Sequence, residues 1–263
     1  MSNFNQIGFS VDTEEDYNAL CLSHSETASF EQETALGTYV CWQESADFGP
    51  ELWIQAEGDS IIGMHPYFRG KSEVKIGAVD IIDQSKITPL DAPLFCWFNP
   101  EKGNPDSGET QCLVDMVRYF SFDKKLPSMQ TLSISAFAQE MDIYESAEKY
   151  NELHKGFTEE DIDNDDFNIV DAMALESFFS VGLFTDEETD EVPEPIALFS
   201  ATVLETQKMK NPSTGRAYTW ALVRTLGGTF DVVVGKEIQG DKPIHVGSVI
   251  KGAFWMGADF KDA

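Results

Sequence analysis

Three segments of the sequence carry residue types that could do chemistry, and the first has the spacing of a phosphate-binding loop. Residues 103–110, GNPDSGET, follow the pattern G-x-x-x-x-G-K-[ST], except that Glu109 stands where the lysine belongs. A carboxylate at that place repels a β- or γ-phosphate, and Pro105 removes one backbone N–H from the cradle. We therefore interpret this segment as a surface loop and not as a nucleotide site.

The second segment has part of the spacing of a calcium-binding loop. Asp161, Asp163 and Asp165 occupy positions one, three and five of an EF-hand-like stretch. Asp166 replaces the glycine required at position six, and Ala172 replaces the bidentate glutamate at position twelve. We interpret the segment as an acidic, solvated loop or helix entry, and we expect neither a metal ion nor another cofactor.

The third segment surrounds His65, in the aromatic string GMHPYF of residues 63–68, just before the first basic residues of the chain. His65, Tyr67 and Arg69 could line a pocket, although a hydrogen-bonded histidine at a strand end or turn is the simpler interpretation. The four histidines are dispersed, and no H-E-x-x-H, G-x-S-x-G or G-x-G-x-x-G motif occurs. With 46 acidic residues, carboxylate pairs arise by chance, so the sequence nominates no catalytic residue. We expect a non-enzymatic protein, with an enzyme of unknown type as the remaining alternative.

Cations and aromatic residues occur together in the last 67 residues, as they do on barrel faces that bind single strands. Two other interpretations stay open. The aromatic residues could form the core of a barrel, and the cations could serve as a docking surface for the acidic part of the chain, which we prefer. The candidate binding residues on this face are Lys208, Lys210, Arg216, Tyr218, Trp220 and Arg224.

The cysteines show neither metal-ligand nor redox spacing. Cys21, Cys41, Cys96 and Cys112 include no C-x-x-C pair, and two of them lie in the apolar strings YVCW and LFCWF. We expect buried, reduced thiols.

Short runs rich in β-branched and aromatic residues, bounded by Gly, Pro, Asn and Asp, predict more strands than helices. Helices are expected at 13–21, where Asp12 would be the N-cap with Glu15 three positions on, at 144–154, and within 159–175. No internal repeat of fixed period is found. Strands are expected at 38–43, 51–55, 74–82, 93–98, 132–137, 197–206, 217–225, 229–234 and 249–256.

The four runs after residue 196 predict a small antiparallel barrel. A long first strand, a turn, a second strand, a Gly227-Gly228 hairpin and a third strand, closed by the final GSVIKGAFWMG, resemble the OB fold. The strings GTYVCW, ELWIQ, IIGMHPYFRG and GAFWMG are similar to those of a family of uncharacterised bacterial proteins. That resemblance implies no activity and no site residues.

Charge divides the chain. Residues 1–68 hold 12 acids and no Lys or Arg, residues 139–196 hold 19 acids and 2 bases, and residues 197–263 hold 6 acids and 8 bases. The acidic segment around 186–195 ends in two prolines, which is typical of an exposed connector. We expect a mainly β, α+β protein: an acidic α+β body at 1–192 and an OB-like barrel at 193–263.

The net charge of −28 disfavours binding of the whole chain to nucleic acid or to anionic lipid. No apolar run is long enough to span a bilayer, and the N-terminus has no secretory leader, so we expect a soluble cytoplasmic protein. Our leading hypothesis is an interaction protein whose acidic body steers a basic protein partner. The alternatives are a barrel that binds single-stranded nucleic acid or oligosaccharide, and acidity that serves solubility alone.

Overall fold

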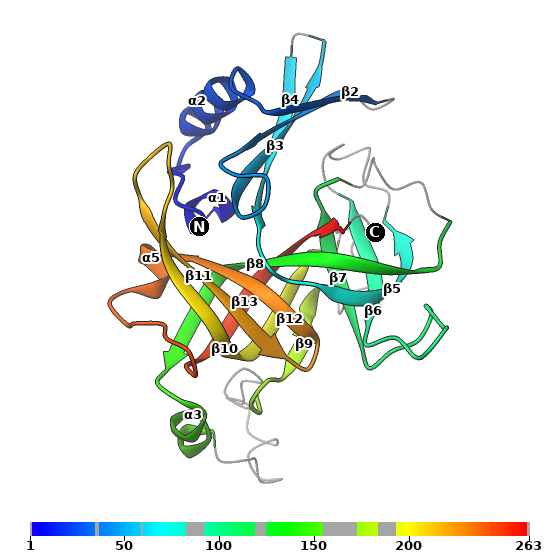
Figure 1. Cartoon of the computed structure of the whole chain (residues 1–263), viewed down its shortest axis with the longest axis vertical. Coiled ribbons are helices and arrows are strands. Elements are labelled where there is room, and N and C mark those ends of the chain that lie inside the picture. The colour runs from blue at the N-terminus through cyan, green and yellow to red at the C-terminus, as the bar shows by residue number, and fades with distance from the viewer. Residues whose placement is uncertain are drawn as a thin grey trace.

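The protein consists mainly of β-strands, as its sequence predicts. The computed structural model describes residues 2–34, 37–58, 60–82, 92–118, 125–154, 173–183 and 193–261. Its strands form a four-stranded sheet near the N-terminus and a nine-stranded sheet that contains most of the rest of the chain. Figure 1 shows the smaller sheet, with helix α2 beside it, lying as a separate layer over the larger one.

The four-stranded sheet is antiparallel, in the order β1-β2-β3-β4. Its last strand was not expected from the sequence, because Pro66 interrupts the run of β-formers. β4 is an edge strand, the place in a sheet where a missing N–H is tolerated. The strands are β1 (Phe30–Thr34), β2 (Gly37–Gln43), β3 (Gly49–Glu57) and β4 (Ser60–Arg69).

The nine-stranded sheet has the order β11-β12-β8-β5-β6-β7-β13-β10-β9, with additional pairings β11–β10 and β8–β13. The nine runs expected from the sequence all fall on strands of the two sheets, and β1, β4, β7 and β9 were missed. The strands of this sheet are β5 (Val74–Ile81), β6 (Pro93–Phe98), β7 (Thr110–Met116), β8 (Ser128–Tyr144), β9 (Phe178–Ser180), β10 (Ile196–Lys210), β11 (Ala217–Thr225), β12 (Gly228–Gly235) and β13 (Val249–Phe260).

The pairings close the sheet into two rings. In the first ring, β10, β11 and β12 form an antiparallel meander, β12 pairs in parallel with β8, and β8 and β10 both pair with β13. In the second ring, β5, β6 and β7 form the meander, β7 pairs in parallel with β13, and β13 and β5 both pair with β8. The two rings therefore share β8 and β13.

The two rings repeat one topology, although the sequence shows no repeat of fixed period. In each ring a three-strand meander is followed by a fourth strand that pairs antiparallel with the first strand of its own meander. That fourth strand also pairs in parallel with the last strand of the other meander. The symmetry lies in the hydrogen-bonding pattern and not in residue identity, so a search for sequence repeats does not detect it.

The change of charge near residue 192 is not a boundary of the sheet. β10 to β13, all after residue 193, form one continuous sheet with β5 to β8, all before residue 145. Along β13, twelve residues from Val249 to Phe260 pair with β8, with one register shift between Ala253 and Phe254. The first ring takes its fifth strand, β8, from the segment expected to form the acidic body. Whether residues 193–263 fold independently is a separate question from this pairing and is decided by expressing that fragment alone.

Apolar side chains fill two main cores. One core is continuous through both rings, with Ile76 and Val114 from the second ring, Phe199 and Val223 from the first, and Phe254 from the shared strand β13. The other lies between the outer surface of the first ring and the small sheet with its helices α1 and α2. The small sheet is thus held on the outside of the first ring by burial of apolar area.

The helices α1, α2 and α3 are capped by the hydroxyl side chains of Ser2, Thr13 and Ser146, whereas α5 begins after Gly235 without a side-chain cap. The N-cap of α2 lies one residue later than expected from the sequence. Thr13, not Asp12, accepts a hydrogen bond from the Asp16 backbone N–H at 3.1 Å, and the Asp16 side chain completes the capping box. Most of the helix expected within 159–175 lies outside the described residues. The helices are α1 (Asn3–Gln6), α2 (Glu14–Ser25), α3 (Ala147–Leu153) and α5 (Lys236–Gln239).

Candidate functional site

A buried group of charged side chains joins the small sheet to the rings. Arg69, at the end of β4, donates to the Glu51 carboxylate on β3 at 2.5 Å and to Asp259 on β13 at 3.1 Å. Arg118, just after β7, also pairs with Asp259, at 2.7 Å. Both carboxylates are fully buried, while Arg69 keeps 24% of its side chain exposed. We call Glu51, Arg69, Arg118 and Asp259 the ionic cluster.

The three residues that the sequence suggests as the lining of a pocket lie together on one face of β4. Side chains alternate along a strand, so His65, Tyr67 and Arg69 share the face of β4 that contacts β7, β8 and β13, whereas Met64 and Phe68 enter the apolar core against the outer surface of the first ring. His65 Nε2 lies 2.8 Å from Asp115 on β7, and the Tyr67 hydroxyl donates to a β8 carbonyl at 3.0 Å. These three side chains therefore form part of the interface between the small sheet and the rings.

Burial and pairing set the ionisation of the ionic cluster. Burial raises the pKa of the Glu51 carboxyl, and the neighbouring Arg69 guanidinium counteracts that rise. For Arg69, burial disfavours the charge, but the Glu51 carboxylate outweighs it and raises the pKa further above its ordinary value. Each buried carboxylate has an arginine within hydrogen-bond distance, which offsets part of the cost of burying it; removal of one partner would leave an uncompensated charge between the two layers.

Two of the candidate residues of the C-terminal face are core residues. Tyr218 and Trp220 are each 2% exposed and lie in the core under the small sheet. The Trp220 indole donates to Asp231 at 2.8 Å, and its ring is covered by Phe48 in an edge contact at 5.0 Å. Neither ring is presented to solvent for stacking on a base. Asp231, which organises this region, was not singled out from the sequence because a lone carboxylate in an apolar strand has no motif.

The four candidate cations divide into two pairs. Arg216 and Arg224 each have an acidic partner: Arg216 pairs with Glu237, and Arg224 pairs with Glu176 at 2.9 Å. Lys208 and Lys210, near the end of β10, are exposed and form no ion pair with the residues that the structure describes. The cationic potential of this face is therefore concentrated at the β10–β11 end of the first ring.

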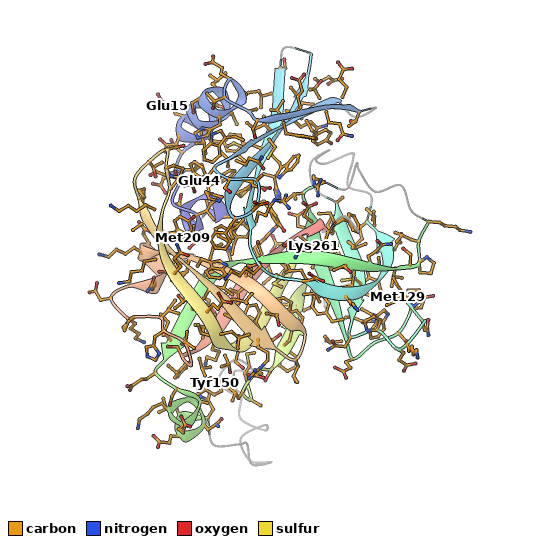
Figure 2. All side chains as sticks on the ribbon, viewed as in Figure 1. Glu15, Glu44, Met129, Tyr150, Met209 and Lys261 are labelled. Atoms are coloured by element: carbon orange, nitrogen blue, oxygen red, sulfur yellow. The ribbon has the colours of Figure 1, made fainter. Side chains whose placement is uncertain are left out.

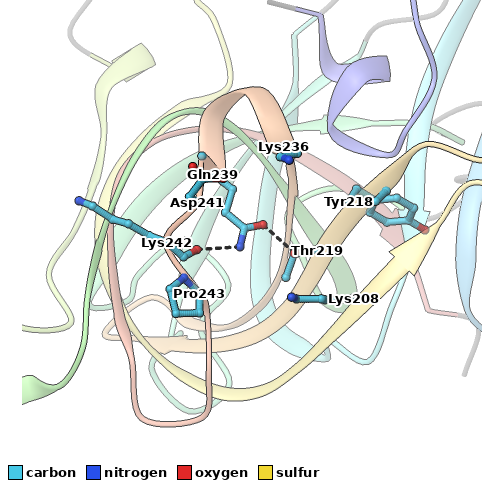
Figure 3. Close-up of a pocket in the computed structure, with 10 residues that line it drawn as sticks. Lys208, Tyr218, Thr219, Lys236, Gln239, Asp241, Lys242 and Pro243 are labelled. Carbon is cyan, nitrogen blue, oxygen red and sulfur yellow. Dashed lines mark hydrogen bonds between the residues drawn. The ribbon is translucent and has the colours of Figure 1, made fainter.

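A pocket of about 270 Å³ opens at that end of the first ring. Figure 3 shows lysines from three segments around it: Lys208 from β10, Lys236 from α5 and Lys242 from the loop after α5. Thr219 donates to the Gln239 side chain at 2.7 Å, which fixes α5 against β11. The Tyr218 ring points away from the lysines, so this residue contributes its backbone to the lining.

An acidic face covers the small sheet and α2. Figure 2 marks two of its members, Glu15 on α2 and Glu44 in the β2–β3 loop. Only one carboxylate of the described part of residues 2–68, Glu51, is buried, and no Lys or Arg lies in that part of the chain. The acidic face consists of the exposed residues Asp12, Glu14, Glu15, Asp16, Glu26, Glu31, Glu33, Glu44, Asp47 and Glu57.

The loop with phosphate-binding spacing connects β6 to β7. Glu109, at the lysine position, accepts from the Asn99 side chain at 2.9 Å and so fixes the base of the loop. The Glu101 N–H donates to the Ser107 carbonyl at 3.2 Å across it. This geometry is that of a surface turn, and Asn99 also ties it to the Leu226 carbonyl at 2.9 Å. The EF-hand-like stretch 161–172 lies outside the described residues.

All four cysteines are buried free thiols, as expected from their apolar surroundings. Burial raises the pKa of Cys112 to about 12, so this thiol is not a nucleophile at neutral pH. Over the part of the chain that is described, no three His, Cys, Asp or Glu side chains are grouped to hold a metal ion. The helices of that part are also too short or too polar to cross a membrane.

Comparison with known protein families, with curated proteins and with solved structures gives no match to this chain. The family resemblance and the OB-like shape expected from the sequence therefore have no counterpart among those proteins or structures, and the function is inferred from the residues described above.

Proposed function

We propose that this protein is a non-enzymatic binding protein that engages a basic protein partner through the acidic face. The observation that carries the proposal is the distribution of charge in its first 68 residues. Ten exposed carboxylates cover one layer of the molecule, and no Lys or Arg of residues 1–68 accompanies them. A surface of one sign attracts oppositely charged proteins, accelerates their encounter and disfavours acidic partners.

The ionic cluster supports the proposal because it fixes the small sheet to the rings. Arg69 and Arg118 are committed to Glu51 and Asp259 inside the interface. They are not available to neutralise the exposed carboxylates. A firmly docked acidic layer presents its charges in fixed positions, which reduces the entropy lost when a partner binds.

The alternative, a barrel that binds single-stranded nucleic acid or oligosaccharide, has less support. Trp220 and Tyr218 would have to supply stacking surfaces, and both are buried. Arg216 and Arg224 have acidic partners within the chain. The remaining support for this alternative is a group of lysines at the end of the first ring, and these lysines suit a different ligand.

The experiment compares two variants that lose the same charge from different places. One variant neutralises the acidic face with Glu14→Gln, Glu15→Gln, Glu31→Gln and Glu33→Gln. Partners captured by the full-length protein at 0.15 M salt are identified, purified and titrated against it by calorimetry. We expect the face variant to bind at least about tenfold more weakly, since several charge pairs across an interface are lost together.

The matched control neutralises four exposed acids on β8 and in the α3 region. It carries Glu140→Gln, Asp142→Asn, Glu145→Gln and Glu148→Gln, and we expect its affinity to change by less than about twofold. Equal losses in both variants would show that only net charge matters. Capture of abundant basic proteins alone, lost at 0.15 M salt, where charges are screened beyond about 8 Å, would contradict the proposal.

A further inference from the structure

The pocket at the end of the first ring combines features that suit an anionic small molecule. Along β10 and β11, the side chains of Val203 and Val223 face the interior of the ring. The register shift between Val203 and Glu205 restarts the alternation, so that Lys208 lies opposite Thr219 on this inward face. The apolar interior thus ends in a cationic mouth, a common place for a ligand in β-barrels.

The charged side chains in the lining of this mouth are three lysines and one carboxylate. Within the described residues, Lys208, Lys236 and Lys242 form no ion pair. The acids near them are committed elsewhere: Glu237 on α5 pairs with Arg216, and Glu205 on β10 pairs with Lys71. Asp241 is the one carboxylate in the pocket lining, so the lining carries a net positive charge.

The floor of the pocket is held in place by hydrogen bonds that leave the lysines unconstrained. Thr219 donates to Gln239, and the Gln239 amide donates to the Lys242 carbonyl at 3.0 Å, so the loop after α5 is tied to β11. Gly240 turns that loop with φ +63°, a conformation that side chains other than glycine rarely adopt. Such a frame holds Lys208 of β10 and Lys236 of α5 at one space, while the Lys242 side chain extends away from them (Figure 3).

We propose that this pocket binds the phosphoryl group of a small molecule. A phosphate carries between one and two negative charges at neutral pH and accepts hydrogen bonds on several oxygens, which matches lysine donors arriving from different directions. The volume, about 270 Å³, suits a small ligand. The acidic remainder of the molecule repels a long polyanion, so a small phosphorylated compound is favoured over nucleic acid. The site is independent of the acidic face.

The test titrates the full-length protein with inorganic pyrophosphate by calorimetry at low salt. We expect saturable binding that weakens by at least about tenfold in the variant Lys208→Gln/Lys236→Gln, because two charge-assisted contacts are removed. The control Lys102→Gln/Lys125→Gln removes two exposed lysines elsewhere and is expected to change affinity by less than about twofold. Equal loss in both variants, or no saturable binding to the wild type, would overturn the proposal.

Amine labelling of the unmodified protein gives a readout that needs no variant. Pyrophosphate should protect Lys208 and Lys236 from acetylation, measured by peptide mass spectrometry, and leave Lys102 unprotected. Uniform labelling with and without pyrophosphate would contradict the proposal. Inorganic phosphate and glycerol phosphate, titrated in parallel, separate a site for the free ion from one for a phosphoester. Tight binding of a short oligonucleotide without binding of pyrophosphate would overturn the small-molecule assignment in favour of nucleic acid.

Discussion

Among single residues, Glu176 and Arg224 give a pH-dependent prediction. Burial raises the pKa of the Glu176 carboxyl, but hydrogen bonds from Arg224 and Thr202 outweigh it, and the net pKa is lowered. A carboxyl with a lowered folded-state pKa stabilises the protein above its unfolded-state pKa of about 4.3, and this contribution is lost as pH falls. Because Arg224 is 54% exposed, we expect Arg224→Gln to lower the unfolding free energy by only about 0.3–1 kcal/mol at pH 7.

The effect of Arg224→Gln should decrease as pH falls through the lowered pKa of the Glu176 carboxyl, and it should disappear once that carboxyl is protonated in both the folded and the unfolded state. Urea unfolding at a series of pH values measures it. Lys210→Gln, at an exposed lysine that forms no ion pair with the described residues, is the control and should show no such pH dependence. A constant difference from pH 7 to 3 would contradict the assignment of the stabilisation to this pair.

Asp231 is the residue whose substitution should destabilise the fold most clearly. Its fully buried carboxylate accepts from the backbone N–H groups of Lys71 and Ser72, at 2.9 and 2.7 Å, and from the Trp220 indole at 2.8 Å. In Asp231→Asn the side chain has one acceptor oxygen instead of two, and its NH₂ group would face the N–H groups that donate to the carboxylate. We expect a loss of about 2–4 kcal/mol in the unfolding free energy, measured by urea denaturation.

Gly70→Ala tests the same contact from the opposite side. A Cβ at Gly70 would lie 2.1 Å from the Asp231 carboxyl carbon, so the linker between β4 and β5 has to shift and weaken those hydrogen bonds. Asp241→Asn, at an exposed loop position, is the control for loss of one charge. Destabilisation by Asp231→Asn no larger than that of the control would show that the carboxylate does not anchor the linker.

At the scale of elements, β8 decides whether the first ring can close. β8 pairs with three residues of β12 on one side and along the whole of β13 on the other, so its removal leaves these two strands without the partner that joins them. We expect residues 193–263, expressed alone, to show no cooperative thermal transition by circular dichroism, while the full chain does. Adding a peptide of residues 128–144 should restore part of the β signal. A cooperative transition of the fragment alone would show that the charge boundary near 192 also bounds a folding unit.

For the whole molecule, the net charge of −28 predicts an unusual response to salt. Like charges repel one another in the compact state, and added salt screens them, so the unfolding midpoint in urea should rise between about 0.01 and 0.5 M sodium chloride. The variant with Glu14, Glu15, Glu31 and Glu33 changed to Gln should show a smaller rise. A midpoint that falls with salt would indicate that the ionic cluster and the surface ion pairs outweigh this repulsion.

The sequence by itself determined the local structure and the charge map. Alternation and turn residues located strands such as β6 and β11 at their observed bounds, because these signals depend on neighbouring residues. The tertiary structure decided what depends on distant residues. β8 closes the ring of β10 to β13, Trp220 is buried by the small sheet, and Arg69 reaches Asp259 across 190 positions. Periodicity shows which face of a strand is apolar, but only the three-dimensional packing decides which layer covers it.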